Sequence, residues 1–200
     1  HGVMVCQACK TCFPFDDGIL NLLIEKPAPL TLAQKTNFMS AVADRYQSGW
    51  RSWCMDLFCG QKFSNAVEAE TLLAMLEWDQ LPPKPVFIDF GTSHGFYAIT
   101  IAKQLAATHR AGLVIALDFS RKMLIQAYAS AVKNNVAESI LWILADVENT
   151  PVADASVDRV SCGGSLNEYR HPPAAMAEAH RILKENSIYY AMNLFLKKGF

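Results

Sequence analysis

Three polar segments of the chain carry residue types that can hold a nucleotide-like cofactor. Asp89 precedes the turn Gly91–Gly95, whose glycines let the backbone turn sharply and approach a ligand, and the helix expected after it offers unpaired N–H groups. Asp118 follows another apolar run, and its carboxylate can accept two hydrogen bonds from ribose hydroxyls. Asp146 can accept from the exocyclic amine of adenine, while the backbone N–H of Val147 donates to a ring nitrogen. Together these residues predict an adenosine site.

Apolar runs and amphipathic patterns predict the elements that must position these residues. Helical periodicity covers roughly 32–46 and 66–78, and a proline-rich stretch ends the second helix. Strands this apolar are too hydrophobic to be half-exposed, which indicates an α/β fold with a Rossmann-like, doubly wound, mostly parallel sheet covered on both faces. In such a sheet, ligands bind beyond the carboxyl ends of the strands, so the polar segments are expected to meet in one cleft. The five strand-like runs lie at 86–90, 113–117, 140–144, 157–161 and 187–194.

The composition favours a small-molecule partner over a nucleic acid or a membrane. The 200 residues are 52% hydrophobic and 18% charged, which is enough to bury a substantial core. The formal net charge of -1 lacks the basic excess that favours nucleic acid or anionic lipid. No run approaches the roughly 18 apolar residues needed to span a bilayer, and the first residues lack the pattern of a signal peptide. We therefore expect a cytoplasmic location, or the plastid stroma in a plant.

Several motifs, taken in chain order, resemble those of class I S-adenosylmethionine-dependent methyltransferases of the type 11 kind. The resemblance covers about 85 to 195. It rests on Asp89–Gly95, Val114–Leu124, Ala145–Val147 with Pro151 and Asp158 beyond, and Glu178–Lys184. More narrowly, Arg45–Arg51 and the pair Cys6 and Cys9 are similar to plant and cyanobacterial members that carry an amino-terminal zinc knuckle.

The resemblance implies the roles of the cleft residues. S-adenosyl-L-methionine is the expected cofactor and S-adenosyl-L-homocysteine the product, with the glycine turn against the methionine part, Asp118 on ribose, and Asp146 with Val147 on adenine. Gly163 leaves room for the transferred methyl group. The full cofactor-binding set expected is Asp89, Gly91, Thr92, Ser93, Gly95, Asp118, Phe119, Met123, Asp146, Val147 and Gly163. Asp89 has a second interpretation, in which it holds the turn through hydrogen bonds and does not touch the cofactor.

The acceptor side of the cleft is expected at four further positions. Asn167 and Tyr169 lie where the family places substrate-facing residues, although residues at this point also cap the next helix. Tyr46 and Trp50 belong either to a lid over an apolar substrate or to the packing of a helical cap. Candidate general bases are Glu168 and His171, the latter equally consistent with a surface turn.

The chain departs from the family pattern in two places. Ser93 stands where a middle glycine is usual, and His94 after it is either a cofactor or substrate contact or a solvated helix-start residue. A helix and an antiparallel hairpin usually follow the fifth strand in the family, whereas this sequence stops at Phe200, so we expect either that the chain is trimmed or that the terminal strands are absent. A dinucleotide is the competing cofactor, but its fingerprint wants glycine at the first, third and sixth turn positions, and Ser93 and Phe96 occupy two of them.

Half of the six cysteines cluster near the amino terminus. Cys6, Cys9 and Cys12 have spacing that can bind zinc, but a structural site wants four ligands. His1, Cys54 or Cys59 is a candidate fourth ligand; the alternative is a knuckle without metal. The chain thus divides into a partial zinc-knuckle-like lead (1–27), a helical cap or lid (28–84) and a cofactor-binding domain (85–200).

The function that follows is methyl transfer to a small-molecule acceptor, in which the methylated atom is oxygen, carbon or nitrogen. Two alternatives stay open. A zinc knuckle before this fold also occurs in ribosomal RNA base methyltransferases, which would be expected to show a more basic face. A catalytically silent cofactor-fold domain would act only as a binding module.

Overall fold

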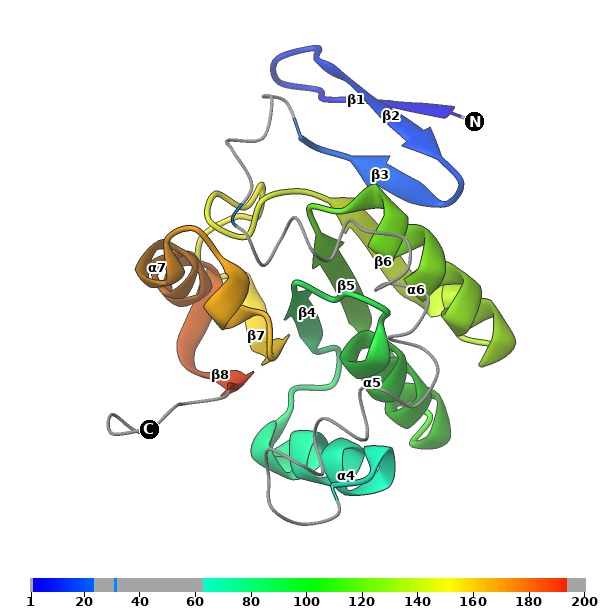
Figure 1. Cartoon of the computed structure of the whole chain (residues 1–200), viewed down its shortest axis with the longest axis vertical. Helices are drawn as coiled ribbons and strands as arrows, with labels where there is room; N and C mark the ends of the chain where they lie inside the picture. Colours follow the sequence, from blue (N-terminus) through cyan, green and yellow to red (C-terminus); the bar gives the residue numbers. More distant parts are fainter. Residues whose placement is uncertain (1, 24–30, 32–62, 194–200) are drawn as a thin grey trace.

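A single eight-stranded sheet organises the part of the chain that the structure describes. The computed structural model describes residues 2–23, 31 and 63–193. The strand order is β1-β2-β3-β6-β5-β4-β7-β8, and the pairs from β3 to β8 are parallel, as Figure 1 shows. The sheet reverses its order beside β4, because β5 and β6 extend on one side and β7 and β8 on the other. The predicted Rossmann-like, mostly parallel fold is confirmed.

The five predicted strands all form. Three of them agree closely with the sequence patterns: β4 is Val86–Phe90, β5 is Leu113–Asp118 and β6 is Ile140–Leu144. β7 runs further than predicted, over Val157–Gly163, and β8 covers Leu183–Met192. β8 starts early because helix α7, Pro172–Ile182, ends directly at the strand.

Both faces of the central parallel strands, β4 to β7, are buried, and alternate residues of each strand face opposite layers. Phe87, Val114 and Trp142 pack with helices α4 (Asn65–Met75), α5 (Phe96–Ala107) and α6 (Arg121–Lys133). Ile88 and Ile115 lie on the other face, where α7 packs. This double burial explains why the strands read as continuous apolar runs.

The amino-terminal lead extends the same sheet. β1 (Gly2–Val5) and β2 (Cys12–Asp16) pair antiparallel, β2 pairs antiparallel with β3 (Ile19–Asn21), and β3 joins the edge of β6 in parallel. These strands have no counterpart among the predicted elements, because they are only three to five residues long. Ile19 is fully buried in the core, so the lead is anchored by packing as well as by hydrogen bonds.

The three amino-terminal cysteines lie at the β1–β2 connection. Cys6 is partly buried, whereas Cys9 and Cys12 are exposed. Hydrogen bonds with Thr11 and Cys6 lower the pKa of the Cys9 thiol to about 7. Within residues 2–23, 31 and 63–193, no group of three or more His, Cys, Asp and Glu side chains is arranged to hold a metal ion. The zinc site remains a prediction, because the proposed fourth ligands His1, Cys54 and Cys59 lie outside the described residues.

The region before the parallel strands is described in part. The predicted helix over 66–78 is α4, with Ser64 as its N-cap accepting a hydrogen bond from the Val67 N–H. The predicted helix over 32–46 lies outside the described residues. In the described part of the chain, no helix is both long and apolar enough to cross a membrane.

Candidate cofactor site

The turn between β4 and α5 is held in a backbone conformation that favours glycine. Gly91, Ser93 and Gly95 have φ values of +60°, +52° and +85°. A Cβ placed on Gly91 would lie 2.4 Å from Ser165 Oγ, so even a methyl group cannot be accommodated without a shift. Ser93 adopts the left-handed conformation at some cost in backbone strain. The turn therefore brings its main chain close to whatever lies beyond β4.

Asp89 holds this turn from beneath. Its side chain is 2% exposed, and it accepts hydrogen bonds from Thr92 Oγ1 at 2.7 Å and Ser161 Oγ at 2.8 Å. Burial raises the pKa of Asp89 to about 6, which these hydrogen bonds partly oppose. The turn-holding interpretation of Asp89 thus has direct geometric support. Its contact with a cofactor stays a prediction.

Asp118 ends β5 and is fixed by main-chain donors. Its side chain is 5% exposed, Oδ2 accepts from the Ser93 N–H at 2.9 Å, and Oδ1 accepts from the Ser120 N–H at 2.8 Å. Burial raises its pKa to about 6 against these hydrogen bonds. Because each carboxylate oxygen has two lone pairs, both oxygens keep an acceptor position that can face ribose hydroxyls. The carboxylate also ties the end of β5 to the glycine turn.

Asp146 follows β6 and has different surroundings. Its side chain is 30% exposed and pairs with the guanidinium of Arg170. Oδ1 accepts from the Glu148 N–H at 2.9 Å. The neighbouring Val147 side chain is buried in the layer with α7. The structure therefore places a partly exposed acceptor where the sequence predicts adenine.

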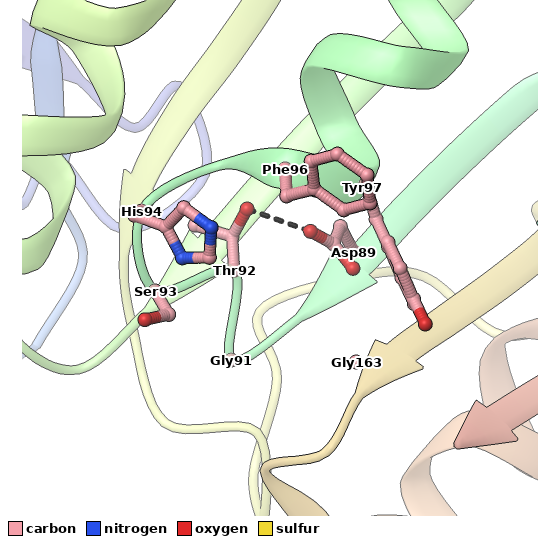
Figure 2. Close-up of a pocket in the computed structure, with 8 residues that line it drawn as sticks. All are labelled: Asp89, Gly91, Thr92, Ser93, His94, Phe96, Tyr97 and Gly163. Carbon is pink, nitrogen blue, oxygen red and sulfur yellow. Dashed lines mark hydrogen bonds between the residues drawn. The ribbon is translucent and has the colours of Figure 1, made fainter. Parts of the chain in front are cut away.

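A pocket opens above the glycine turn, with about 320 Å³ of empty space that includes part of the open solvent. Figure 2 shows the Thr92 hydroxyl directed at Asp89 and the Tyr97 ring extending toward the strand that carries Gly163. Tyr97 Oη lies 3.7 Å from Met192 Sδ. The pocket is lined by Asp89, Gly91, Thr92, Ser93, His94, Phe96, Tyr97 and Gly163.

Two lining residues were absent from the predicted site. Phe96 was considered only as an obstacle to a dinucleotide, and Tyr97 was not considered at all. Their position in the first turn of α5, directly after the glycine turn, is the signal that would have found them. Met123 lies nearby, with its sulfur 4.0 Å from Ser93 Oγ, and is almost buried.

The predicted acceptor-side residues follow β7 but differ in exposure. Asn167 is exposed, whereas Tyr169 is buried with its hydroxyl 2.8 Å from Ser165 Oγ. The carbonyl of Glu168 accepts from Thr31 Oγ1 at 3.0 Å. His171 is exposed at the N-cap of α7. Their substrate and proton-transfer roles stay predictions, and Tyr46 and Trp50 lie outside the described residues.

The arrangement fits a nucleoside cofactor with an amino-acid end. The glycines let the turn pack closely, because a Cβ on Gly91 would meet Ser165 and one on Gly95 would meet Ala127. Carboxylates at the ends of two adjacent parallel strands can meet ribose and adenine in order along the edge. The backbone N–H of Phe119, which follows Asp118, partly opposes the rise in the pKa of that carboxylate. These features belong to the switch point of the sheet, where open α/β folds bind nucleotides.

Comparison with known proteins agrees with this geometry. A family model described as "Methyltransferase domain" matches residues 88–191. The chain is 27% identical over 203 residues to an uncharacterized chloroplastic methyltransferase of Arabidopsis thaliana, covering 95% of this chain and 53% of that protein. It is 29% identical over 109 residues to a 2-phytyl-1,4-naphtoquinone methyltransferase of Nostoc punctiforme, covering 54% and 46%. The chain thus spans about half the length of these relatives.

Solved structures share the fold. The crystal structure of a protein from Methanococcus maripaludis, described as an S-adenosyl-L-methionine-dependent methyltransferase, aligns with this chain with a TM-score of 0.61 at 21% identity. The alignment covers 84% of this chain and 68% of that one. The [4+2]-cyclase SpnF aligns with a TM-score of 0.56 at 16% identity, covering 82% and 60%. At these identities the likeness concerns the fold alone.

Proposed function

Because the chain belongs to the methyltransferase domain family, we propose that it transfers a methyl group from S-adenosyl-L-methionine to a small-molecule acceptor. The observation that carries the proposal is the placement of Asp118 between the glycine turn and the end of β5, where two backbone N–H groups fix its carboxylate. A carboxylate so oriented can accept both ribose hydroxyls.

The residues of the chain position the reactants. The bound cofactor supplies an activated methyl group on a sulfonium. The glycine turn and Gly163 let the main chain approach its methionine end, Asp118 fixes the ribose, and Asp146 selects the adenine. Alignment of the acceptor with the methyl carbon and exclusion of water then account for most of the rate enhancement that such a site gives.

The acceptor is proposed to be a partly apolar small molecule. Support comes from relatives named as methyltransferases of 2-phytyl-1,4-naphtoquinone and demethylmenaquinone. The net charge of -1 disfavours the ribosomal RNA alternative. Two Arabidopsis relatives are named chloroplastic, which supports the plastid as the proposed location.

Proton removal from the acceptor is assigned to Glu168 or His171. A phenol or an activated carbon loses a proton on methylation, so a nearby base would assist, whereas an amine acceptor can react through its lone pair. Both residues follow β7 on the acceptor side.

The test is a transfer assay with S-adenosyl-L-methionine labelled in the methyl group. We expect label in a demethylated prenyl-naphthoquinone supplied in its reduced quinol form, whose ring carbon is nucleophilic, and none in ribosomal RNA, with transfer lost in Asp118→Ala. Label in RNA alone would favour the nucleic-acid alternative. Cofactor binding without transfer to any acceptor in a broad panel would favour the silent binding module.

A further inference from the structure

The segment between β7 and α7, residues 164–171, contacts the proposed methionine end of the cofactor site. We call it the β7–α7 segment. Ser165 Oγ donates to the Phe90 carbonyl at 3.2 Å, and the Tyr169 hydroxyl lies 2.8 Å from the same Oγ. Because Ser165 has a single hydroxyl proton, which goes to Phe90, Tyr169 is the donor in the second bond. This chain of bonds fixes the segment directly beneath Gly91.

The other end of the β7–α7 segment contacts the proposed adenine end. The guanidinium of Arg170 pairs with Asp146 and lies 3.6 Å from Glu148 Oε2. Glu148 Oε1 accepts from the backbone N–H groups of Arg170 at 2.8 Å and of His171 at 3.0 Å. The side chain and the main chain of Arg170 are therefore held by two acidic residues that follow β6.

Asp146 can bind adenine while it stays paired with Arg170. Oδ1 accepts the Glu148 N–H and Oδ2 accepts Arg170, yet a carboxylate offers about four acceptor positions. The Asp146 side chain is also 30% exposed, which leaves room for an incoming amine. The Arg170 side chain is 22% exposed, so the pair is partly shielded from solvent.

From these contacts we propose that Arg170 is a positioning residue that orients Asp146 for the exocyclic amine of adenine. The inference rests on the proposed function, since it assumes that the cleft binds S-adenosyl-L-methionine. Through Glu148 and its own main chain, Arg170 also couples adenine binding to the β7–α7 segment on the acceptor side. Such coupling is reciprocal, so an ordered segment favours the donor and a bound donor orders the segment.

The experiment compares two ligands by calorimetry on the 200-residue chain. S-adenosyl-L-homocysteine carries the amine, whereas S-inosyl-L-homocysteine carries a carbonyl oxygen in its place. We expect Arg170→Ala to lower the affinity for S-adenosyl-L-homocysteine about tenfold, which is the effect of losing one charge-assisted hydrogen bond. The affinity for the inosyl compound should fall by less than about twofold. Arg170→Lys keeps the charge but not the planar fork, and should restore the selectivity in part.

Hydrogen exchange measures the coupling directly, because a purely structural role of Arg170 would not change how the ligand affects exchange in the β7–α7 segment. S-adenosyl-L-homocysteine should slow exchange at the N–H groups of Arg170 and His171 in the wild type and leave it unchanged in Arg170→Ala. The matched control is Arg121→Ala, which removes an ion pair with Asp17 at 2.8 Å and should preserve both affinity and selectivity.

Three results would overturn the inference. Equal losses of affinity for the two ligands in Arg170→Ala would show that Arg170 acts on stability alone. Tighter binding of S-adenosyl-L-homocysteine in this variant would show that Arg170 competes with adenine for Asp146. Failure of the wild type to bind S-adenosyl-L-homocysteine would instead overturn the proposed function, and the inference with it.

Discussion

The two ends of the candidate cofactor site are built in different ways. At the glycine-turn end, backbone N–H groups fix the Asp118 carboxylate, which is 5% exposed, and the buried Asp89 carboxylate holds the turn. At Asp146, which is 30% exposed, a side chain from the β7–α7 segment forms the ion pair. The first end is therefore preformed by the sheet, whereas the second depends on a segment that also faces the acceptor.

The largest expected effect is at the preformed end, in Gly91→Ala. The new Cβ would lie 2.4 Å from Ser165 Oγ on a backbone with φ +60°, so we expect S-adenosyl-L-homocysteine affinity to fall at least about 100-fold, together with a lower melting temperature. Gly164→Ala is the matched control, because Gly164 also has a positive φ of +93°, but a Cβ there would lie 3.9 Å from the Met192 carbonyl oxygen and make no clash. Equal effects in the two variants would mean that backbone strain, and not the clash, determines the loss.

The next effect compares the two carboxylates directly. Asp118→Asn places an amide NH2, which can only donate, against one of the two backbone N–H groups. The affinity for S-adenosyl-L-homocysteine should therefore fall about 50-fold, which agrees with roughly 1.5–3 kcal/mol for a hydrogen bond to a charged group. Asp146→Asn keeps an acceptor for the adenine amine but weakens the pairing with Arg170, so it should lower the affinity about tenfold, as Arg170→Ala does. Calorimetry on both variants checks the order, and a larger loss in Asp146→Asn would contradict the distinction between the two ends.

Acidification should weaken binding through Asp118. Its pKa is raised to about 6 from 3.8, and ribose hydroxyls donate to the ionised form, so affinity should fall roughly tenfold between pH 7 and pH 5. Unfolding would not explain this fall. The folded state takes up protons at Asp118 and Asp89 between about pH 4 and 6 while the unfolded chain does not, so these groups add stability as the pH drops through that window.

The pH titration is run by calorimetry with thermal melts in parallel. An affinity that does not change with pH, or an unchanged profile in Asp118→Asn, would show that Asp118 is not the titrating group.

The two ends of the site also differ in how far the sequence predicts them. Strand runs, small turn residues and the acids after each strand are local signals, and they placed Asp89, Asp118 and Asp146 at one edge of the sheet. The Arg170 contact joins residues 24 positions apart and has no local signal. The strands of the lead have no local signal either, because they are short and form by pairing with one another and, through β3, with β6.

The smallest effect concerns the residue that departs from the family pattern. Ser93→Gly relieves a φ of +52° but adds freedom to the unfolded chain, so we expect the free energy of unfolding to rise by less than about 1 kcal/mol. Urea denaturation measures this change, and affinity for S-adenosyl-L-homocysteine should stay within about threefold. A clear loss of affinity would mean that the Ser93 hydroxyl contacts the ligand.

The most direct test of the account is a crystal structure of the chain with S-adenosyl-L-homocysteine. The account predicts both ribose hydroxyls on the Asp118 carboxylate, the adenine amine on Asp146 still paired with Arg170, and the homocysteine end above the turn Gly91–Gly95. A ligand bound elsewhere, or with its adenosine turned away from both carboxylates, would contradict it.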